Sequence, residues 1–384
     1  MAAPLSLYLH IPYCAQKCAY CDFNSYAGSI LEDQIAYVAA LEAEMRRYAA
    51  DPRVAGRPIV TAFAGGGTPT LLPSRLLAQV LAKAREIFPF AADAEVSVEA
   101  NPGTVDFAGD KLRAAFAAGA NRLSFGVQAF QDELLQRLGR VHSVAEVERA
   151  VAAARAAGFR NLNLDLMYGL PGQGVNDWRE TLEHALALAP EHISAYSLII
   201  EEGTAFHVEW ERGRLEVPDE AVEEEMFHLV RATLGAAGYE QYEVSNFARP
   251  GYRSRHNQVY WRNEEYLGLG AGAHSYLNGE RFWNIRLPQT YVRRLKAGQS
   301  PVEGGEQLDA PGAMAETMMM GLRLLDGVEE ERFATRFGRP LGEVYGPVLS
   351  RLQRDGLLEQ AGAAWRLTAR GLRLGNQVWA EFLP

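Results

Sequence analysis

Apolar and polar positions divide the first half of the chain into short apolar blocks and longer segments with apolar residues at helical spacing. The apolar blocks predict strands at residues 5–11, 58–64, 95–100, 122–127, 161–167 and 192–200. The segments between them predict helices at residues 31–50, 73–88, 106–118, 131–138, 143–157 and 176–188. Such alternation favours a parallel α/β sheet. Periodicity alone does not distinguish an open, doubly wound sheet from a partial barrel.

The alternation stops after residue 200. We expect a polar, glycine-punctuated loop at 201–213, an acidic amphipathic helix at 218–237 and a strand near 241–247. Residues 304–309 have the composition of a linker. Helices at 313–325, 329–337 and 341–355, a hairpin near 358–368 and a last helix then predict a winged-helix-like appendage, which we interpret as a structural lid. The expected domains are 1–200, 201–303 and 304–384.

Composition narrows the class of protein. The chain is 48% hydrophobic and 22% charged, as ordinary globular proteins are. Its net charge of −10 argues against nucleic acid as a partner, because phosphate binding requires clustered Lys and Arg. No signal peptide or membrane-spanning run is visible, which leaves only peripheral membrane contact open. With 3 cysteines and no disulfide framework, we expect a cytoplasmic protein.

All 3 cysteines lie in one short segment, as Cys14, Cys18 and Cys21 with C-x3-C-x2-C spacing. Thiolates this close can converge on one soft metal centre. Three ligands on a four-iron cluster leave one iron open for chemistry, whereas a structural zinc site usually has a fourth ligand. Three buried structural cysteines, or a zinc site that borrows a remote histidine, are the alternatives.

Polar residues and glycines also follow the ends of several predicted strands. The segment from Gly65 to Thr68 follows the second strand, Glu99 the third, Gln128 the fourth and Asp165 the fifth. Parallel α/β proteins build their sites at this edge of the sheet. Glycines there let the backbone approach a ligand closely. The bland alternative for Glu99 is an exposed carboxylate at a strand end.

The cysteine segment resembles the signature of radical S-adenosylmethionine (SAM) enzymes. Its flanks, Tyr8-x-His-Ile-Pro and Tyr20, resemble oxygen-independent coproporphyrinogen III oxidases and the related HemW heme chaperone family. The resemblance implies a (β/α)6 partial barrel, with a [4Fe–4S] cluster on the cysteines at its mouth and SAM on the open iron. It implies SAM contacts, to one or two molecules, from Tyr8, Tyr20, Gly66, Gly67, Thr68, Glu99, Gln128, Arg140 and Asp165.

A second motif, His-Asn-Gln-Val-Tyr-Trp at 256–261, resembles the mark of the heme chaperone family. This resemblance implies that His256 binds heme iron, a role that suits a neutral imidazole. Tyr260 and Trp261 are then expected to stack on the porphyrin. The alternative is a hydrogen-bonded histidine beside core aromatics, with His274 as the next candidate ligand.

Two departures separate the chain from the oxidases. Phe23 stands where the oxidases carry a fourth cysteine, and the segment before Cys14 is shorter than theirs. Both favour a heme chaperone that binds heme and transfers it to an acceptor protein. The first alternative is a coproporphyrinogen III oxidase, which decarboxylates its substrate with a 5′-deoxyadenosyl radical. The second is a zinc-stabilised scaffold.

Overall fold

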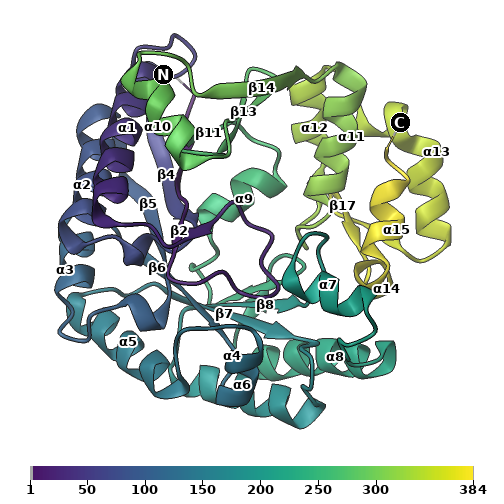
Figure 1. The fold of residues 1–384 in the computed structure, drawn as a ribbon. Helices are drawn as coiled ribbons and strands as arrows, with labels where there is room; N and C mark the ends of the chain where they lie inside the picture. Colours follow the sequence, from purple (N-terminus) through teal and green to yellow (C-terminus); the bar gives the residue numbers. More distant parts are fainter. Residues whose placement is uncertain (1–2, 384) are drawn as a thin grey trace.

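A computed structural model describes residues 3–383. Its centre is a 12-stranded sheet, in which the strands from the first half of the chain lie side by side in chain order (Figure 1). All pairs among the first strands are parallel. These strands confirm the predicted parallel α/β sheet and are β1 (Leu5–Ile11), β4 (Ile59–Gly66), β5 (Phe90–Ala100), β6 (Arg122–Gln128), β7 (Leu162–Tyr168) and β8 (His192–Ser197).

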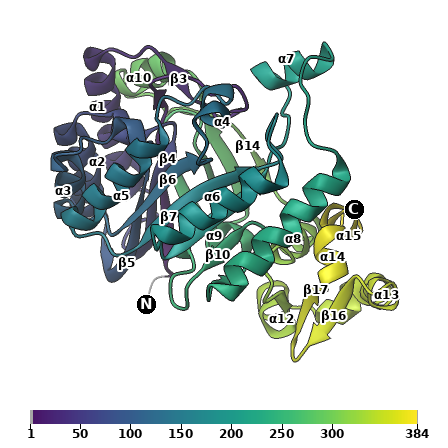
Figure 2. The same cartoon turned by 90° about the horizontal axis from the view of Figure 1, so that it is seen from below.

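Helices cover the outer face of this parallel half (Figures 1 and 2). They are α1 (Leu31–Ala49), α2 (Ser74–Ile87), α3 (Asp110–Ala117), α4 (Asp132–Arg137), α5 (Val144–Ala157) and α6 (Val175–Ala187). The strands are buried on both faces, which explains why they are apolar blocks without strict alternation. Helix α3 begins later than predicted, because Gly109 adopts a φ of 79° just before it.

The sheet extends beyond the parallel strands on both sides, which the sequence did not predict. Strand β11 (Tyr266–Leu269) pairs parallel with β1, and β12 (His274–Leu277), β13 (Glu280–Asn284) and β14 (Val302–Gln307) continue the sheet. The expectation of a linker at 304–309 was therefore wrong for residues 304–307. Strand β14 is polar and glycine-containing because it lies at the sheet edge, partly in solvent.

On the other side of the sheet, residues 241–247 form two strands, not one. Strands β9 (Glu240–Gln241) and β10 (Asn246–Ala248) pair through a tight turn, and β10 pairs antiparallel with β8. The expected loop at 201–213 contains helix α7 (Ala205–Glu211), which Thr204 caps through its side chain. Figure 2 shows α7 standing away from the sheet. Helices α8 (Glu220–Ala236), α9 (Arg255–Trp261) and α10 (Pro288–Lys296) complete this region.

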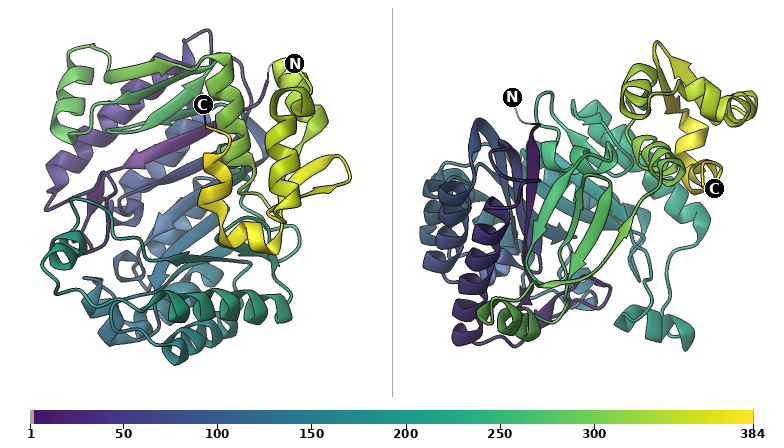
Figure 3. Two further views of the ribbon diagram at one scale, coloured as in Figure 1. Left: turned by 90° about the vertical axis from the view of Figure 1, so that its right-hand side faces the viewer. Right: turned by 90° about the horizontal axis from the view of Figure 1, so that it is seen from above.

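The C-terminal part has its own apolar cluster and lies against the side of the barrel (Figure 3). Its elements are α11 (Ala310–Gly321), β15 (Val328–Glu329), α12 (Glu330–Phe337), α13 (Leu341–Arg354), β16 (Leu358–Ala361), β17 (Ala364–Leu367), α14 (Ala369–Arg373) and α15 (Gly375–Ala380). The expected boundary after residue 303 falls inside β14, so we propose a boundary after Gln307. No helix of residues 3–383 has the length and apolar character needed to cross a bilayer.

Candidate functional site

The loop after β1 brings the three thiols together. Cys14, Cys18 and Cys21 are unbridged and half-buried, and all three line one cavity of about 360 Å³. Short strands β2 (Tyr13–Cys14) and β3 (Tyr26–Ala27) pair at the two ends of the loop. Backbone hydrogen bonds to Leu138 and from Phe206 hold its middle at Ala19. The loop is therefore fixed against elements that end at the mouth of the barrel.

The donor set suits an iron–sulfur cluster better than a single ion. Among residues 3–383, no group of three His, Cys, Asp or Glu side chains is spaced to hold one metal ion. A cluster bonds each thiolate to a different iron, so the thiols need not meet at one point. Polar donors already face two sulfurs, with Thr68 Oγ1 at 3.5 Å from Cys14 Sγ and an Arg140 guanidinium nitrogen at 3.3 Å from Cys18 Sγ. Hydrogen bonds of this kind tune thiolate ligands.

The glycines after β4 make a close backbone approach. A Cβ on Gly67 would lie 2.7 Å from the Ile11 carbonyl oxygen, and one on Gly66, whose φ is 100°, would lie 2.2 Å from the His10 ring. The amides of Gly67 and Thr68 instead donate to the carbonyls of Ile11 and Tyr13. Glycine is required at these positions because no side chain fits, and the packing fixes this segment beside the cysteine loop.

Glu99 lies near the end of β5. It is not an exposed carboxylate, which was the alternative to a ligand contact. Its Oε2 accepts a hydrogen bond of 3.0 Å from the Gly66 amide. Burial, and next the nearby charge of Asp165, raise the pKa of Glu99 to about 8. Asp165 in turn accepts hydrogen bonds from Ser124 and Asn163, and burial raises its pKa. Two half-buried carboxyl groups with raised pKa values mark this as a candidate ligand site.

The backbone adopts an unusual conformation at the end of β6. Gln128, the last residue of β6, has a φ of 72° and follows an irregularity in the pairing of β6 with β7. Left-handed backbone is unfavourable for a residue with a side chain, and such positions cluster at functional sites. The Gln128 side chain lines the same cavity as the thiols.

The structure brings nearly all the expected SAM contacts into the cysteine cavity. Tyr20, Gly66, Gly67, Thr68, Glu99, Gln128, Arg140 and Asp165 line it. Tyr8 lines a neighbouring cavity instead, which shares Gly66 and Glu99 with the first. Sequence reasoning missed Asn101, Ser124 and Tyr196, which also line the first cavity. Ser124 could have been found, because it lies on the same face of β6 as Gly126 and Gln128 by strand alternation.

His256 is placed differently from its expected role. It is 0% exposed, its Nδ1 lies 2.8 Å from Thr61 Oγ1 and its Nε2 lies 2.9 Å from the Tyr260 hydroxyl. Both ring nitrogens are thus occupied, which matches the alternative of a hydrogen-bonded core histidine. Burial lowers the pKa of His256 to about 3.

Trp261 and Tyr260 point to different parts of the molecule. Trp261 packs on the guanidinium of Arg323, which lies 4.6 Å from its ring centroid and 4.5 Å from that of Trp379 in α15. Tyr260 lines the second cavity, which does not include Trp261. The expected joint stacking of both rings on one porphyrin therefore does not fit this arrangement.

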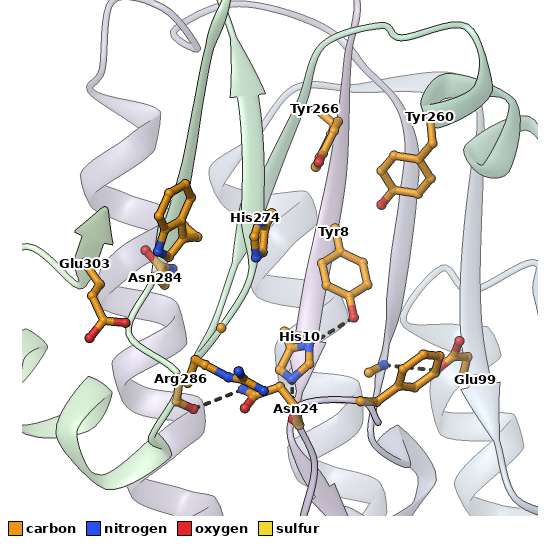
Figure 4. A pocket seen from close by; sticks show the side chains of 14 residues that line it. Tyr8, His10, Asn24, Glu99, Tyr260, Tyr266, His274, Asn284, Arg286 and Glu303 are labelled. Carbon is orange, nitrogen blue, oxygen red and sulfur yellow. Dashed lines mark hydrogen bonds between the residues drawn. The ribbon is translucent and has the colours of Figure 1, made fainter. Parts of the chain in front are cut away.

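The second cavity, drawn in Figure 4, has a volume of about 620 Å³. It adjoins the cysteine cavity, because Gly66 and Glu99 line both. Tyr8 and Tyr266 line it from β1 and β11, and His274 and Trp283 from β12 and β13. Phe23 borders both cavities and is 59% exposed. A cavity of this size is within the range of small-molecule and cofactor sites.

Comparison with known proteins gives consistent matches. The family model described as the radical SAM superfamily matches residues 8–185, and that of the HemN C-terminal domain matches 308–374. The heme chaperone HemW of Bacillus subtilis is 41% identical over 382 residues, covering 98% of this chain and 99% of that protein. HemW of Escherichia coli is 38% identical over 384 residues, covering 99% of this chain and 98% of that protein.

The chain belongs to the HemW heme chaperone family of the radical SAM superfamily. The resemblance inferred from the cysteine segment and its flanks is thus confirmed. The solved structure of coproporphyrinogen III oxidase (HemN) from Escherichia coli, a radical SAM enzyme, aligns with a TM-score of 0.85 at 25% identity. It covers 99% of this chain and 90% of that one, which confirms the predicted fold class. Membership of this superfamily implies a [4Fe–4S] cluster and SAM.

Proposed function

We propose that the protein is a heme chaperone, which binds heme and transfers it to an acceptor protein. The observation that carries this proposal is the similarity to heme chaperones along the whole chain, on both sides of residue 200. Phe23 supports it, because this side chain lies between the two cavities where the oxidases have a fourth cysteine. A cytoplasmic location stays a prediction.

We further propose that Cys14, Cys18 and Cys21 hold the cluster, which supplies an open iron for SAM. The Thr68 hydroxyl donates to the sulfur of Cys14, and the Arg140 guanidinium donates to the sulfur of Cys18 and offsets its negative charge. Gly66 and Gly67 pack closely against His10 and Ile11, which holds their backbone at the cavity, and Glu99 offers a half-buried carboxyl group for ribose hydroxyls. The remaining candidates for SAM contacts are Tyr8, Tyr20, Gln128 and Asp165.

Titration of the anaerobically reconstituted protein with hemin tests the proposal. We expect the heme absorption band to shift on binding and to saturate at one hemin per chain. Transfer is tested by mixing the loaded protein with an excess of an apo-hemoprotein and following the spectrum of the acceptor. The absence of saturable hemin binding would exclude the chaperone function.

A further inference from the structure

The cavity beside the cysteine site is built largely from residues that neither the cluster nor SAM requires. Strands β11 to β13 supply Tyr266, His274 and Trp283, and Arg286 follows the end of β13 (Figure 4). Its inner end is closed by Tyr8, His10 and Glu99, and its outer rim is formed by exposed residues that include His274, Arg286 and Glu303. The cavity is therefore open to solvent on one side and adjoins the SAM site on the other.

Three histidines lie in or near this cavity, and they differ in what their ring nitrogens contact. His10 is bonded at both nitrogens, to the Tyr8 hydroxyl at 3.0 Å and the Asn24 carbonyl at 2.9 Å. His256 is likewise bonded at both, as described above. Within residues 3–383, His274 makes no side-chain hydrogen bond. Iron binds an imidazole through an in-plane nitrogen lone pair, so only His274 offers one without breaking a bond.

The neighbouring strand orients the His274 ring. His274 and Trp283 are opposite residues of the β12–β13 pair, and their rings stack with centroids 5.7 Å apart and planes at 27°. Stacking covers one face of the imidazole and leaves its in-plane nitrogens uncovered.

The other walls suit a flat aromatic dianion. Tyr260 and Tyr266 meet edge to face with centroids 4.8 Å apart and give the cavity an aromatic side. Among the described residues, the Arg286 guanidinium has no ion pair, although its backbone carbonyl accepts from Asn24. Glu303 is the acidic residue at the rim, so carboxylates of a ligand are expected on the Arg286 side.

We propose that this cavity holds the heme, with His274 as an axial ligand of the iron and Arg286 as the partner of a propionate group. The inference rests on the proposed chaperone function and moves the heme ligand from the family motif at His256 to strand β12. His256 then has a positioning role, because it fixes α9 and the Tyr260 ring that lines the cavity.

The test is a hemin titration of the reconstituted full chain and of His274→Ala. We expect the variant to bind hemin roughly tenfold more weakly, with a shifted Soret band that added imidazole returns to the wild-type position. His228→Ala, which removes an exposed histidine of α8, is the control and should have the hemin affinity and Soret band of the wild type. A second variant, Arg286→Gln, should weaken hemin binding but leave binding of hemin dimethyl ester unchanged, because the ester has no propionate charge.

The outcomes separate the inference from the proposed function. Failure of the wild-type protein to bind hemin would remove the chaperone function itself. Wild-type binding with an unchanged Soret band and affinity in His274→Ala would overturn the inference and leave the function standing. A folded His256→Ala variant whose Soret band shifts while that of His274→Ala does not would also overturn it and return the ligand to the motif.

Discussion

At the scale of single residues, hydrogen bonding decides which polar side chains around the barrel mouth can still bind a ligand. The sequence identified the thiols of Cys14, Cys18 and Cys21 correctly as a group, since their spacing alone places them in one loop. It also identified His256, but a motif does not reveal that Thr61, far away in the chain, lies 2.8 Å from its ring. Such a partner becomes visible only when the strands are placed side by side.

Replacement of one thiol tests the cluster site. We expect Cys18→Ser to lose the [4Fe–4S] cluster, because the chain has no other cysteine to replace the ligand. Iron and sulfide analysis after anaerobic reconstitution measures the effect. Gln16→Ala is the control within the same loop, because Gln16 is exposed and carries no thiol. Full iron and sulfide content in Cys18→Ser would show that the site lies elsewhere.

The carboxyl group at the end of β5 tests the SAM site. Glu99→Ala should weaken SAM binding by roughly 1–3 kcal/mol, because a buried hydrogen-bonding group loses its partner. Equilibrium binding of SAM to the reconstituted protein measures this. Glu99→Gln should lose less SAM affinity than Glu99→Ala, because the amide oxygen can still accept a hydrogen bond. The exposed Glu133→Ala should bind SAM as tightly as the wild type. Equal affinity in Glu99→Ala and the wild type would leave Glu99 with a structural role only.

At the scale of secondary-structure elements, burial explains which strands the sequence could predict. Strands β1, β6 and β7 are covered on both faces, so each is a continuous apolar block with recognisable ends. Strands β11 and β14 contain glycines, and β14 is mostly exposed, so their patterns match turns and linkers. Pairing with β1 and β13 makes them strands, and pairing partners are not encoded in local periodicity.

One buried carboxyl group joins an element of the parallel half to the sheet extension. Glu44 of α1 accepts hydrogen bonds from the Gly270 amide, the Asn284 side chain and the Tyr291 hydroxyl. Burial raises the pKa of Glu44 and is the largest effect, whereas the three hydrogen bonds lower it. The net result is a pKa raised from 4.5 to about 7. The folded state therefore favours the protonated group, whereas the unfolded chain ionises it at lower pH.

This coupling predicts a pH dependence of stability. The contribution of protonated Glu44 is fully present below about pH 4.5 and is lost as the pH rises through about 7, a change of about 3 kcal/mol in the free energy of unfolding. Urea unfolding across this range should show a smaller pH dependence for Glu44→Gln than for the wild type. The exposed Glu32→Gln of the same helix should behave as the wild type does. Identical pH profiles for Glu44→Gln and the wild type would contradict the assignment.

At the scale of the whole molecule, the notable feature is that two cavities share one wall. The cysteine cavity and the cavity around His274 have Phe23, Gly66 and Glu99 in common. The first cavity could be predicted from the sequence, because the carboxyl ends of parallel strands meet at one edge of the sheet. It could not place the second, which forms only where β11 to β13 extend the sheet past β1.

This arrangement also bears on the choice between chaperone and oxidase. A radical enzyme must hold the reacting carbon of its substrate within about 0.5 Å of the productive geometry. Phe23, which borders both cavities, stands where the oxidases carry a fourth cysteine, and this is the region where such positioning takes place. We therefore expect the cluster and SAM to be bound without oxidation of a porphyrinogen.

The most direct measurement is an anaerobic incubation of the reconstituted protein with coproporphyrinogen III, SAM and a reductant, followed by analysis of the porphyrins. The same preparation, shown to bind hemin, serves as the positive control for folding. We predict that coproporphyrinogen III is recovered unchanged. Formation of harderoporphyrinogen or protoporphyrinogen at a rate that depends on SAM and on Cys18 would contradict the chaperone function and make the protein an oxidase.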